Sequence, residues 1–259
     1  HNTFPLISPS AYWTAAKAQV PLVQTLHNFR LLCPQAMFLR DGRVCEDCLG
    51  HVPWRGAARG CYRGSKAQTA VLAGAISLHR SVGTYHHKVA RYIALNEFCR
   101  RKFIEGGLPA ERIAVKPNFV DAGPLGDKHP RAGFLFVGRL SGEKGIGVLA
   151  QASSQLRDVP TRVVGSGPEA AVLQQCNSIR MLGALDAEQV RVEMARAFAL
   201  VVPSIWYETF GLVIVEAFAS GLPVIASRIG VIPGLVEDGV NGLLFEPGNA
   251  ADLAAKMAW

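Results

Sequence analysis

Residues 201–247 read VVPSIWYETFGLVIVEAFASGLPVIASRIGVIPGLVEDGVNGLLFEP, and the order of elements in this stretch sets the architecture of the chain. The apolar run 200–202 predicts a buried parallel strand. Apolar residues then recur at helical spacing over 212–220, and Gly221-Leu222-Pro223 ends that helix before a second strand at 224–226. This succession of strand, loop, helix and strand is typical of an α/β sheet with parallel strands.

The loop before this helix is predicted to face a ligand crevice, because open α/β sheets bind ligands outside the carboxyl ends of their strands. The loop carries Glu208, and Glu216 follows eight residues later inside the helix. The first helical turn, at Phe210, Gly211 and Leu212, offers unpaired N–H groups and a glycine for close approach, which favours a phosphate site. A carboxylate such as Glu216 suits ribose hydroxyls.

Two carboxylates in one loop and helix also raise the alternative of a glycosidase acid and base. If the residues from Glu208 to Glu216 were all helical, the two would lie ~12 Å apart along the axis and ~80° apart around it. That is too far for paired carboxylates that act on one bond, so the glycosidase reading is rejected. The other alternative is that both glutamates are solvated.

The pattern E-x7-E at 208–216, followed by SGLPVIAS and NGLLFEP, resembles the nucleotide-sugar site of retaining GT-B glycosyltransferases of family 4. The resemblance covers nearly the whole chain and is strongest over 133–247. It implies an α/β fold with two Rossmann-like domains facing a cleft. We expect a truncated acceptor-side domain with a cysteine-containing insertion at 1–120 and a nucleotide-sugar-binding domain at 121–259, with a hinge rich in Pro, Gly and charge at 117–131.

The chain departs from the family pattern at one loop. After SGLPVIAS the family commonly has G-G-x-P-E, whereas this chain has Gly230-Val231-Ile232-Pro233-Gly234. The change removes a glycine and a carboxylate, so we expect a different loop geometry there. The start without methionine, and the end inside a helical pattern at 254–259, are what a fragment would show.

Residues 133–152 read GFLFVGRLSGEKGIGVLAQA and predict a strand at 133–137, a crevice loop, and a helix at 144–156. Their match to the family's G-R-x5-K implies that Gly138, Arg139 and Lys144 lie against the donor diphosphate, which two cations can clamp. The stretch lacks G-x4-G-K-[ST] and is therefore not a P-loop. Solvated loop charges are the alternative.

Four further residues complete the predicted donor site. The strand and glycine turn at 163–168 resemble the family loop that lines the nucleotide base, which assigns Gly165 and Gly167 to that role, with Leu182 from the next strand in the same pocket. His27 follows a strand predicted at 21–27, and in the family a histidine in this place lies near the donor sugar. A structural histidine is the alternative.

Four cysteines, Cys33, Cys45, Cys48 and Cys61, contain one C-x2-C pair and could form a tetrahedral zinc site that holds a long insertion together. Neighbouring arginines are expected to lower the thiol pKa values. Reduced, partly buried cysteines or a disulfide are the alternatives. A catalytic metal is not expected, since four cysteines would leave no open coordination position.

The formal net charge of +7 arises in one segment. Residues 49–95 hold seven Lys or Arg and no acid, so the rest of the chain has twenty charges of each sign. With Trp54, Tyr62 and an apolar stretch, this segment could meet an anionic membrane surface or a phosphorylated acceptor, or be an ordinary solvated face. No nucleic-acid module is found, and no apolar run approaches the ~18 residues of a transmembrane helix.

Taken with the resemblance, these features predict an enzyme that moves a hexosyl group from a nucleoside-diphosphate sugar, UDP- or GDP-linked, to a glycan or lipid-linked acceptor with retention of configuration. Arg139 and Lys144 would stabilise the leaving diphosphate, Glu208 would hold sugar hydroxyls, and His27 would lie on the far side of the sugar. The reaction would need no metal, and the enzyme would work in the cytoplasm, at the inner membrane face if it docks there. The alternatives are a nucleotide-sugar epimerase of the same fold and a non-catalytic binding fragment.

Overall fold

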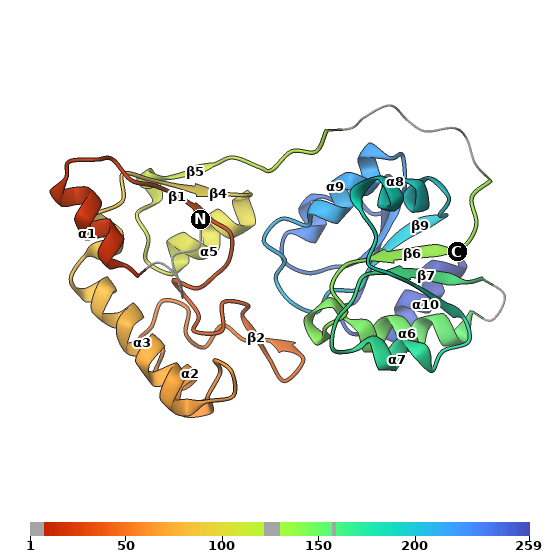
Figure 1. The fold of residues 1–259 in the computed structure, drawn as a ribbon, viewed down its shortest axis with the longest axis horizontal. Coiled ribbons are helices and arrows are strands. Elements are labelled where there is room, and N and C mark those ends of the chain that lie inside the picture. The colour runs from red at the N-terminus through yellow and green to blue at the C-terminus, as the bar shows by residue number, and fades with distance from the viewer. Residues whose placement is uncertain (1–7, 122–129, 157–158) are drawn as a thin grey trace. The chain divides into compact units, whose positions relative to one another are not determined.

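The computed structural model of the chain describes residues 8–121, 130–156 and 159–259. It contains two compact units, His1–Asn118 and Phe119–Trp259 (Figure 1). Each unit has its own parallel β-sheet with helices packed on it, so the predicted α/β fold class is confirmed. Residues 1–7, and the part of the predicted hinge at 122–129, lie outside the described residues.

The second unit contains a six-stranded sheet of order β11-β10-β9-β6-β7-β8. Every neighbouring pair is parallel. Its strands are β6 (Phe134–Val137), β7 (Thr161–Val164), β8 (Ile179–Gly183), β9 (Ala199–Val202), β10 (Val224–Ser227) and β11 (Gly242–Phe245). The chain runs outward in one direction from β6 and in the other from β9, so the loops that leave these adjacent strands diverge. Such a switch point is where open α/β sheets bind ligands.

Helices cover both faces of this sheet (Figure 1). The helices are α6 (Ile146–Gln155), α7 (Ala170–Gln174), α8 (Ala187–Ala195), α9 (Leu212–Ala219) and α10 (Ala250–Ala258). In Figure 1, α6, α7 and α10 lie on one face and α8 and α9 on the other. The first group encloses a core in which Phe136, Ile146, Leu149 and Leu253 are almost fully buried. Each such side chain contributes about 1.5–3 kcal/mol of burial free energy, which fixes the strand ends that carry the site.

One helix begins later than its sequence pattern predicts. The helix expected from 144 starts at Ile146, after a short 3-10 turn (η2, Gly142–Lys144) and a left-handed Gly145 with φ 72°. A Cβ at Gly145 would lie 1.9 Å from the carbonyl oxygen of Pro203. Only glycine permits this contact, and it brings the loop after β6 against the loop after β9.

The first unit has a three-stranded parallel sheet of order β1-β4-β5, from β1 (Val23–Leu26), β4 (Arg91–Ala94) and β5 (Ile113–Val115). Its helices are α1 (Ser10–Lys17), α2 (Trp54–Arg59), α3 (Lys66–Ser81), α4 (Thr84–His87) and α5 (Glu97–Glu105). Asn96 caps α5, because its side chain accepts from the Cys99 N–H at 2.8 Å. The sequence patterns did not predict α2 or the small hairpin of β2 (Leu39–Arg40) and β3 (Arg43–Val44).

Two short 3-10 turns complete the described elements, η1 (Ala110–Arg112) before β5 and η3 (Ile232–Gly234) after β10. The η3 turn falls in the loop where the chain departs from the family pattern. Ile232 is fully buried there, and Pro233 stands in the first turn. The loop with Val231 and Gly234 is therefore an ordered turn packed into the unit.

Candidate functional site

The loops that leave β6 and β9 bring Lys144 and Glu208 together. Lys144 Nζ lies 2.7 Å from Glu208 Oε1, and the side chains are 26% and 10% exposed. The same carboxylate oxygen accepts hydrogen bonds from Ser204 Oγ at 2.7 Å and Trp206 Nε1 at 3.0 Å. Lys144 Nζ also lies 5.4 Å from the centroid of the Trp206 ring. The three donors fix one carboxylate oxygen of Glu208, and no described residue donates to the other.

Arg139 lies in the loop after β6 with its own carboxylate partner, Glu143. Arg139 Nη2 donates to Glu143 Oε1, and Arg139 Nε donates to Ser141 Oγ at 3.1 Å. Burial disfavours the charged form of Glu143, but hydrogen bonds from Arg139 and Ser141 outweigh it and lower the pKa of that carboxyl. The site thus holds two cations, each paired with a carboxylate.

The predicted glycines hold the surrounding loops at close range. A Cβ at Gly165 would lie 1.9 Å from the carbonyl oxygen of Gly138, and one at Gly167 would lie 2.3 Å from that of Leu140. The loops after β6 and β7 therefore pack backbone against backbone at the same end of the sheet. Leu182 is half-buried near the end of β8, and the Gly165 N–H donates to the carbonyl of the following residue, Gly183. The role of these residues in base binding stays a prediction.

Helix α9 begins beside this loop cluster at Leu212. Gly211 stands before it in a left-handed conformation with φ 78°, and no described side chain caps the helix. Phe210 is buried and Leu212 is exposed, so the first turn is open to solvent on one side. An uncapped first turn retains unsatisfied N–H groups and a partial positive charge, as an anion site requires.

Glu216 lies one turn into α9 and is half-buried. Burial raises the pKa of its carboxyl above the ordinary value of 4.5. No described residue forms a hydrogen bond or ion pair with this carboxylate. A half-buried carboxylate without a protein partner is suited to accept hydrogen bonds from ligand hydroxyls.

His27 belongs to the first unit and immediately follows β1. Burial lowers the pKa of its ring, which favours the neutral imidazole. Its predicted place beside the donor sugar depends on the arrangement of the two units and stays a prediction.

The structure does not support the predicted zinc site at Cys33, Cys45, Cys48 and Cys61. Within the described ranges, no group of three or more His, Cys, Asp or Glu could hold a metal ion. All six cysteines are free thiols, which matches the alternative of reduced, partly buried residues.

The expected lowering of the thiol pKa values is wrong for Cys48 and Cys61. Burial raises the pKa of both thiols, and the opposing effect of Arg59 on Cys61 is smaller. Arg59 is itself paired with Asp47, so it does not act as an isolated cation beside the cysteines.

Sequence reasoning missed the residues that support Glu208 and Arg139. Ser204 and Trp206 support Glu208, and Ser141 and Glu143 support Arg139. Three of these polar residues are almost fully buried although they lie in loops: Ser141, Glu143 and Ser204. Their position immediately after predicted strands was the available signal.

Comparisons with known proteins relate the chain to glycosyltransferases. Residues 131–259 match the family model for glycosyl transferases group 1. The phosphatidyl-myo-inositol mannosyltransferase of Mycolicibacterium smegmatis is 33% identical over 189 residues, covering 67% of this chain and 48% of that protein. The GDP-mannose-dependent alpha-mannosyltransferase of Corynebacterium glutamicum is 42% identical over 112 residues, 43% of this chain and 27% of that protein. The matched part of the chain thus spans about half the length of the first of these relatives and about a quarter of the second.

Solved structures show the same fold. A crystal structure of Anabaena HepE in complex with UDP and glucose has a TM-score of 0.69 at 24% identity, and covers 96% of this chain and 64% of that one. The sucrose-phosphate synthase of Thermosynechococcus elongatus has a TM-score of 0.68 at 21% identity, with 97% and 62% covered. The fold is therefore that of GT-B glycosyltransferases, and the chain, through its residues 131–259, belongs to the glycosyl transferases group 1 family.

Proposed function

We propose that this chain carries the donor site of a retaining glycosyltransferase, which moves a hexosyl group from a nucleoside-diphosphate sugar to a glycan or lipid-linked acceptor. The observation that carries the proposal is the pair of ion pairs, Arg139–Glu143 and Lys144–Glu208, in the loops that leave β6 and β9 at the switch point. The start of α9, which no described side chain caps, and the carboxylate of Glu216, which no described residue binds, add sites for phosphate and ribose. The relatives that act as mannosyltransferases, and the UDP and glucose bound to Anabaena HepE, support a nucleotide-sugar donor.

The chemistry that fits this site exchanges two bonds at the anomeric carbon. The bond from that carbon to the diphosphate oxygen breaks, and a bond to the acceptor hydroxyl oxygen forms on the same face of the sugar. The acceptor proton passes to the leaving diphosphate, so no protein base is required. Arg139, Lys144 and the first turn of α9 would stabilise the negative charge that develops on the leaving group.

Glu208 and Glu216 have different parts in this proposal. The oxygen of Glu208 that no described residue binds would accept hydrogen bonds from sugar hydroxyls, and Glu216 would accept those of the ribose. If Lys144 binds the diphosphate and releases Glu208, the hydrogen bonds from Ser204 and Trp206 would still hold the Glu208 side chain in place.

Calorimetric titration of the chain with UDP, GDP and ADP, alongside the Glu216→Ala variant, tests the proposal. Circular dichroism would establish that both proteins are folded. We expect saturable binding of a nucleoside diphosphate that is lost in the variant, and the preferred base would name the donor class. A folded chain that binds none of the three would contradict the donor site and favour a partner-binding role. Binding that persists without transfer to any acceptor would indicate a non-catalytic protein.

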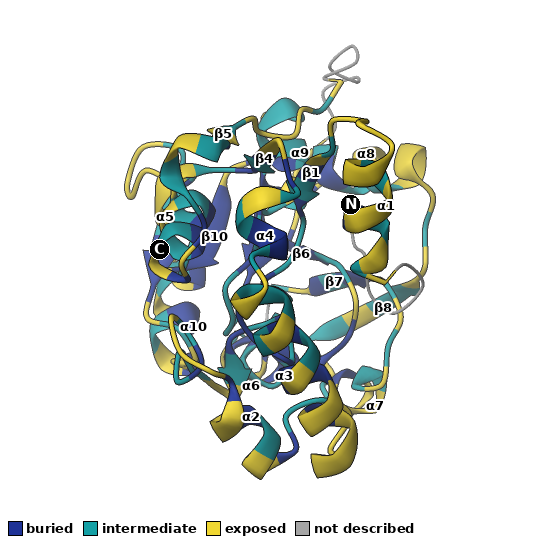
Figure 2. Cartoon of the chain, turned by 90° about the vertical axis from the view of Figure 1, so that its left-hand side faces the viewer, coloured by how far each residue is buried: buried dark blue, intermediate teal, exposed yellow. Residues whose placement is uncertain are grey.

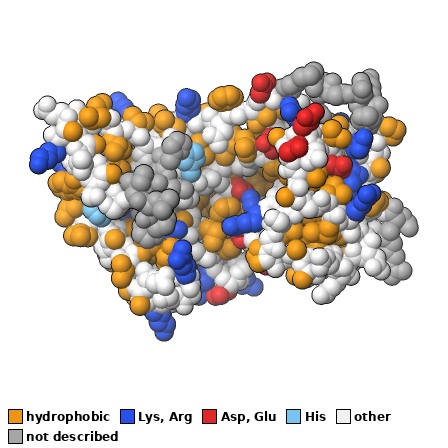
Figure 3. Space-filling model, in the orientation of Figure 1, with side chains coloured by type: hydrophobic (Ala, Val, Ile, Leu, Met, Phe, Trp, Pro, Cys, Tyr) orange, Lys and Arg blue, Asp and Glu red, His pale blue; other side chains and the backbone are white. Residues whose placement is uncertain are grey.

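We also propose that the first unit contacts an anionic membrane through α2 and α3. Trp54 on α2 is 61% exposed, and Val71 and Leu78 on α3 are 76% and 58% exposed. Much of the outward surface of these helices is exposed in Figure 2. Basic and hydrophobic side chains occur along the left-hand margin of the face seen in Figure 3, without acidic ones. No described helix is long and apolar enough to cross a bilayer, so this contact would be peripheral.

Sedimentation with vesicles tests this contact. We expect the chain to bind vesicles of phosphatidylcholine mixed with phosphatidylglycerol, and to bind pure phosphatidylcholine vesicles much less. Leu78→Ser should weaken the binding, whereas Val192→Ser on α8, which removes a partly exposed apolar side chain from the other unit, should not. Equal binding to both kinds of vesicle, or none, would contradict the proposal.

A further inference from the structure

The side chains of Arg139, Ser141 and Glu143 form a closed set of hydrogen bonds in the loop after β6. Arg139 donates from Nη2 to Glu143 Oε1 and from Nε to Ser141 Oγ, and Ser141 Oγ donates to Glu143 Oε1 at 2.8 Å. Ser141 is 6% exposed and Glu143 is 8% exposed, while the side chain of Arg139 is 64% exposed. A buried pair therefore holds one edge of a largely exposed guanidinium.

The held edge determines what the guanidinium can still bind. The Nε and Nη2 atoms form its side-on edge, which the protein occupies. A guanidinium has five N–H donors. The two N–H groups of Nη1 and the second N–H group of Nη2 point away from the edge that the protein occupies. They form a fork that matches two phosphate oxygens. No described residue accepts from Nη1, so this fork is open to a ligand.

Glu143 also connects the two loops of the switch point through its backbone. Its carbonyl oxygen accepts from the Ile205 N–H at 3.0 Å, in the loop that continues to Glu208. The next residue, Lys144, reaches Glu208 with its side chain. The position of Glu143 is thus fixed from both loops, which makes it a rigid support for Arg139.

We propose that Glu143, together with Ser141, is a positioning residue that orients Arg139 so that its outer fork faces the diphosphate of the donor. This inference rests on the proposed function, which makes Arg139 a phosphate ligand. It assigns a task to two buried residues that do not themselves touch the donor. The loss of either would leave the guanidinium free to rotate and would lower its contribution to diphosphate binding.

The sign of the effect separates positioning from simple electrostatics. A carboxylate near a bound diphosphate repels it, so if charge alone mattered, removal of Glu143 would tighten binding. Positioning predicts the opposite: Glu143→Ala should weaken binding of UDP or GDP about tenfold. In Glu143→Gln the amide oxygen can still accept both hydrogen bonds, so affinity should stay within about threefold of the wild type. Uridine or guanosine, which lack phosphates, should bind all variants equally.

A second measurement does not depend on nucleotide binding. In ¹H–¹⁵N NMR spectra, the Nε–H of Arg139, identified by its loss in Arg139→Lys, should give a signal protected from solvent exchange in the wild type and in Glu143→Gln. Glu143→Ala should abolish this protection. Ser141→Ala offers a milder variant if Glu143→Ala does not fold.

The two measurements decide the inference together. Weaker diphosphate binding in Glu143→Ala with lost protection of Arg139 would support it. Unchanged or tighter binding in that variant, or an unchanged Arg139 signal, would overturn it. If the wild type binds no diphosphate, the proposed function fails, and the NMR signal still shows whether Glu143 holds Arg139.

Discussion

Lys144 Nζ lies 2.7 Å from Glu208 Oε1, although 64 positions separate the two residues in the chain. The contact joins the loops that follow β6 and β9, and both side chains are mostly buried. A charge-assisted hydrogen bond in such a place contributes more than a solvated ion pair. The same contact therefore contributes to the stability of the unit and holds the two residues that we propose as ligands of the donor, Lys144 for the phosphate and Glu208 for the sugar.

Lys144→Ala should lower the free energy of unfolding by about 1–3 kcal/mol, because Glu208 would remain buried without its cation. Urea denaturation measures this change. Arg228→Ala is the matched control, since its pair with Asp238 has side chains that are 47% and 38% exposed and should contribute about 0–1 kcal/mol. If the two variants lose equal stability, the Lys144–Glu208 pair does not act as a buried interaction.

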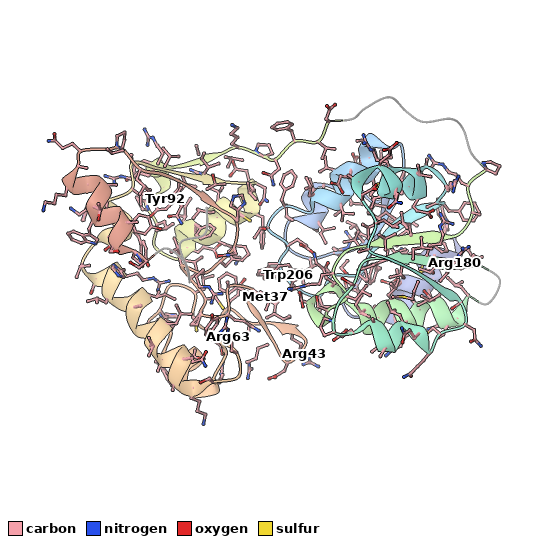
Figure 4. All side chains as sticks on the ribbon, in the orientation of Figure 1. Met37, Arg43, Arg63, Tyr92, Arg180 and Trp206 are labelled. Carbon is pink, nitrogen blue, oxygen red and sulfur yellow. The ribbon has the colours of Figure 1, made fainter. Side chains whose placement is uncertain are left out.

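Arg139→Ala should weaken binding of a nucleoside diphosphate about ten- to hundredfold and leave binding of the nucleoside unchanged, because only the phosphates reach the guanidinium. Calorimetry with both ligands measures the difference. Arg180→Ala is the control: Arg180 is exposed in β8, and Figure 4 shows it at the opposite end of the unit from Trp206. Equal losses for diphosphate and nucleoside would contradict the phosphate assignment.

Glu216→Gln should affect stability and binding in opposite directions. Burial raises the pKa of Glu216 in the folded protein above 4.5, so the unfolded chain ionises first as the pH rises. The glutamate therefore lowers the free energy of unfolding as the pH passes from 4.5 through the raised pKa, and this cost remains at neutral pH. Glu216→Gln should be more stable than the wild type at pH 7 and show no such gain below pH 4.

The same substitution should weaken nucleotide binding, because an amide is a poorer acceptor for ribose hydroxyls than a carboxylate. Urea denaturation at several pH values and calorimetry at pH 7 measure the two effects. A variant that is more stable and also binds nucleotide as tightly as the wild type would show that Glu216 does not contact the ligand.

Gly165→Ala should destabilise the second unit by about 2–4 kcal/mol. The new Cβ would lie 1.9 Å from the Gly138 carbonyl oxygen, in a backbone with φ 136° that side chains rarely adopt. Gly147→Ala in α6 is the control, since no atom lies within 4 Å of the added Cβ, and it should raise stability by about 0.5–1 kcal/mol. Thermal unfolding measures both, and a neutral Gly165→Ala would contradict the close contact.

Cys48 and Cys61 should react slowly with iodoacetamide near neutral pH, because burial raises the pKa of both thiols above the ordinary value of 9.0. Mass spectrometry of peptides after labelling at several pH values measures each rate, with a short thiol peptide as the reference. Labelling faster than the reference at pH 7 would contradict the raised pKa values. About one zinc per chain in elemental analysis would restore the metal site that the structure does not support.

Much of the second unit follows from local patterns. Apolar runs marked β6, β9 and β10, so Arg139, Lys144 and Glu208 could be expected in loops at the carboxyl ends of these strands. The sequence pattern predicts too early a start for α6, because the start depends on the close contact of Gly145 with Pro203, two residues far apart in the sequence. Helical spacing alone cannot register such a contact.

The hydrogen-bond partners within the site could not be predicted from the sequence. Ser204 and Trp206 reach Glu208 within the same short loop. Only the folded backbone shows that these two donors and Lys144 meet at one carboxylate oxygen. The cysteines show the opposite error. Their spacing indicated a zinc site and the neighbouring arginines indicated lowered thiol pKa values, whereas burial, which the sequence does not report, raises the pKa of Cys48 and Cys61.

The strand order of the second unit has a consequence for redesign. The loops that carry the two ion pairs of the site leave the two central strands, β6 and β9, whereas the outer strands β8 and β11 end in loops at the margins of the sheet. Cassettes grafted after β8 or β11 could thus alter which nucleobase or sugar is preferred, while the proposed diphosphate site between β6 and β9 stays intact. The same modularity would let one ancestral scaffold diversify its donors without reinventing its chemistry.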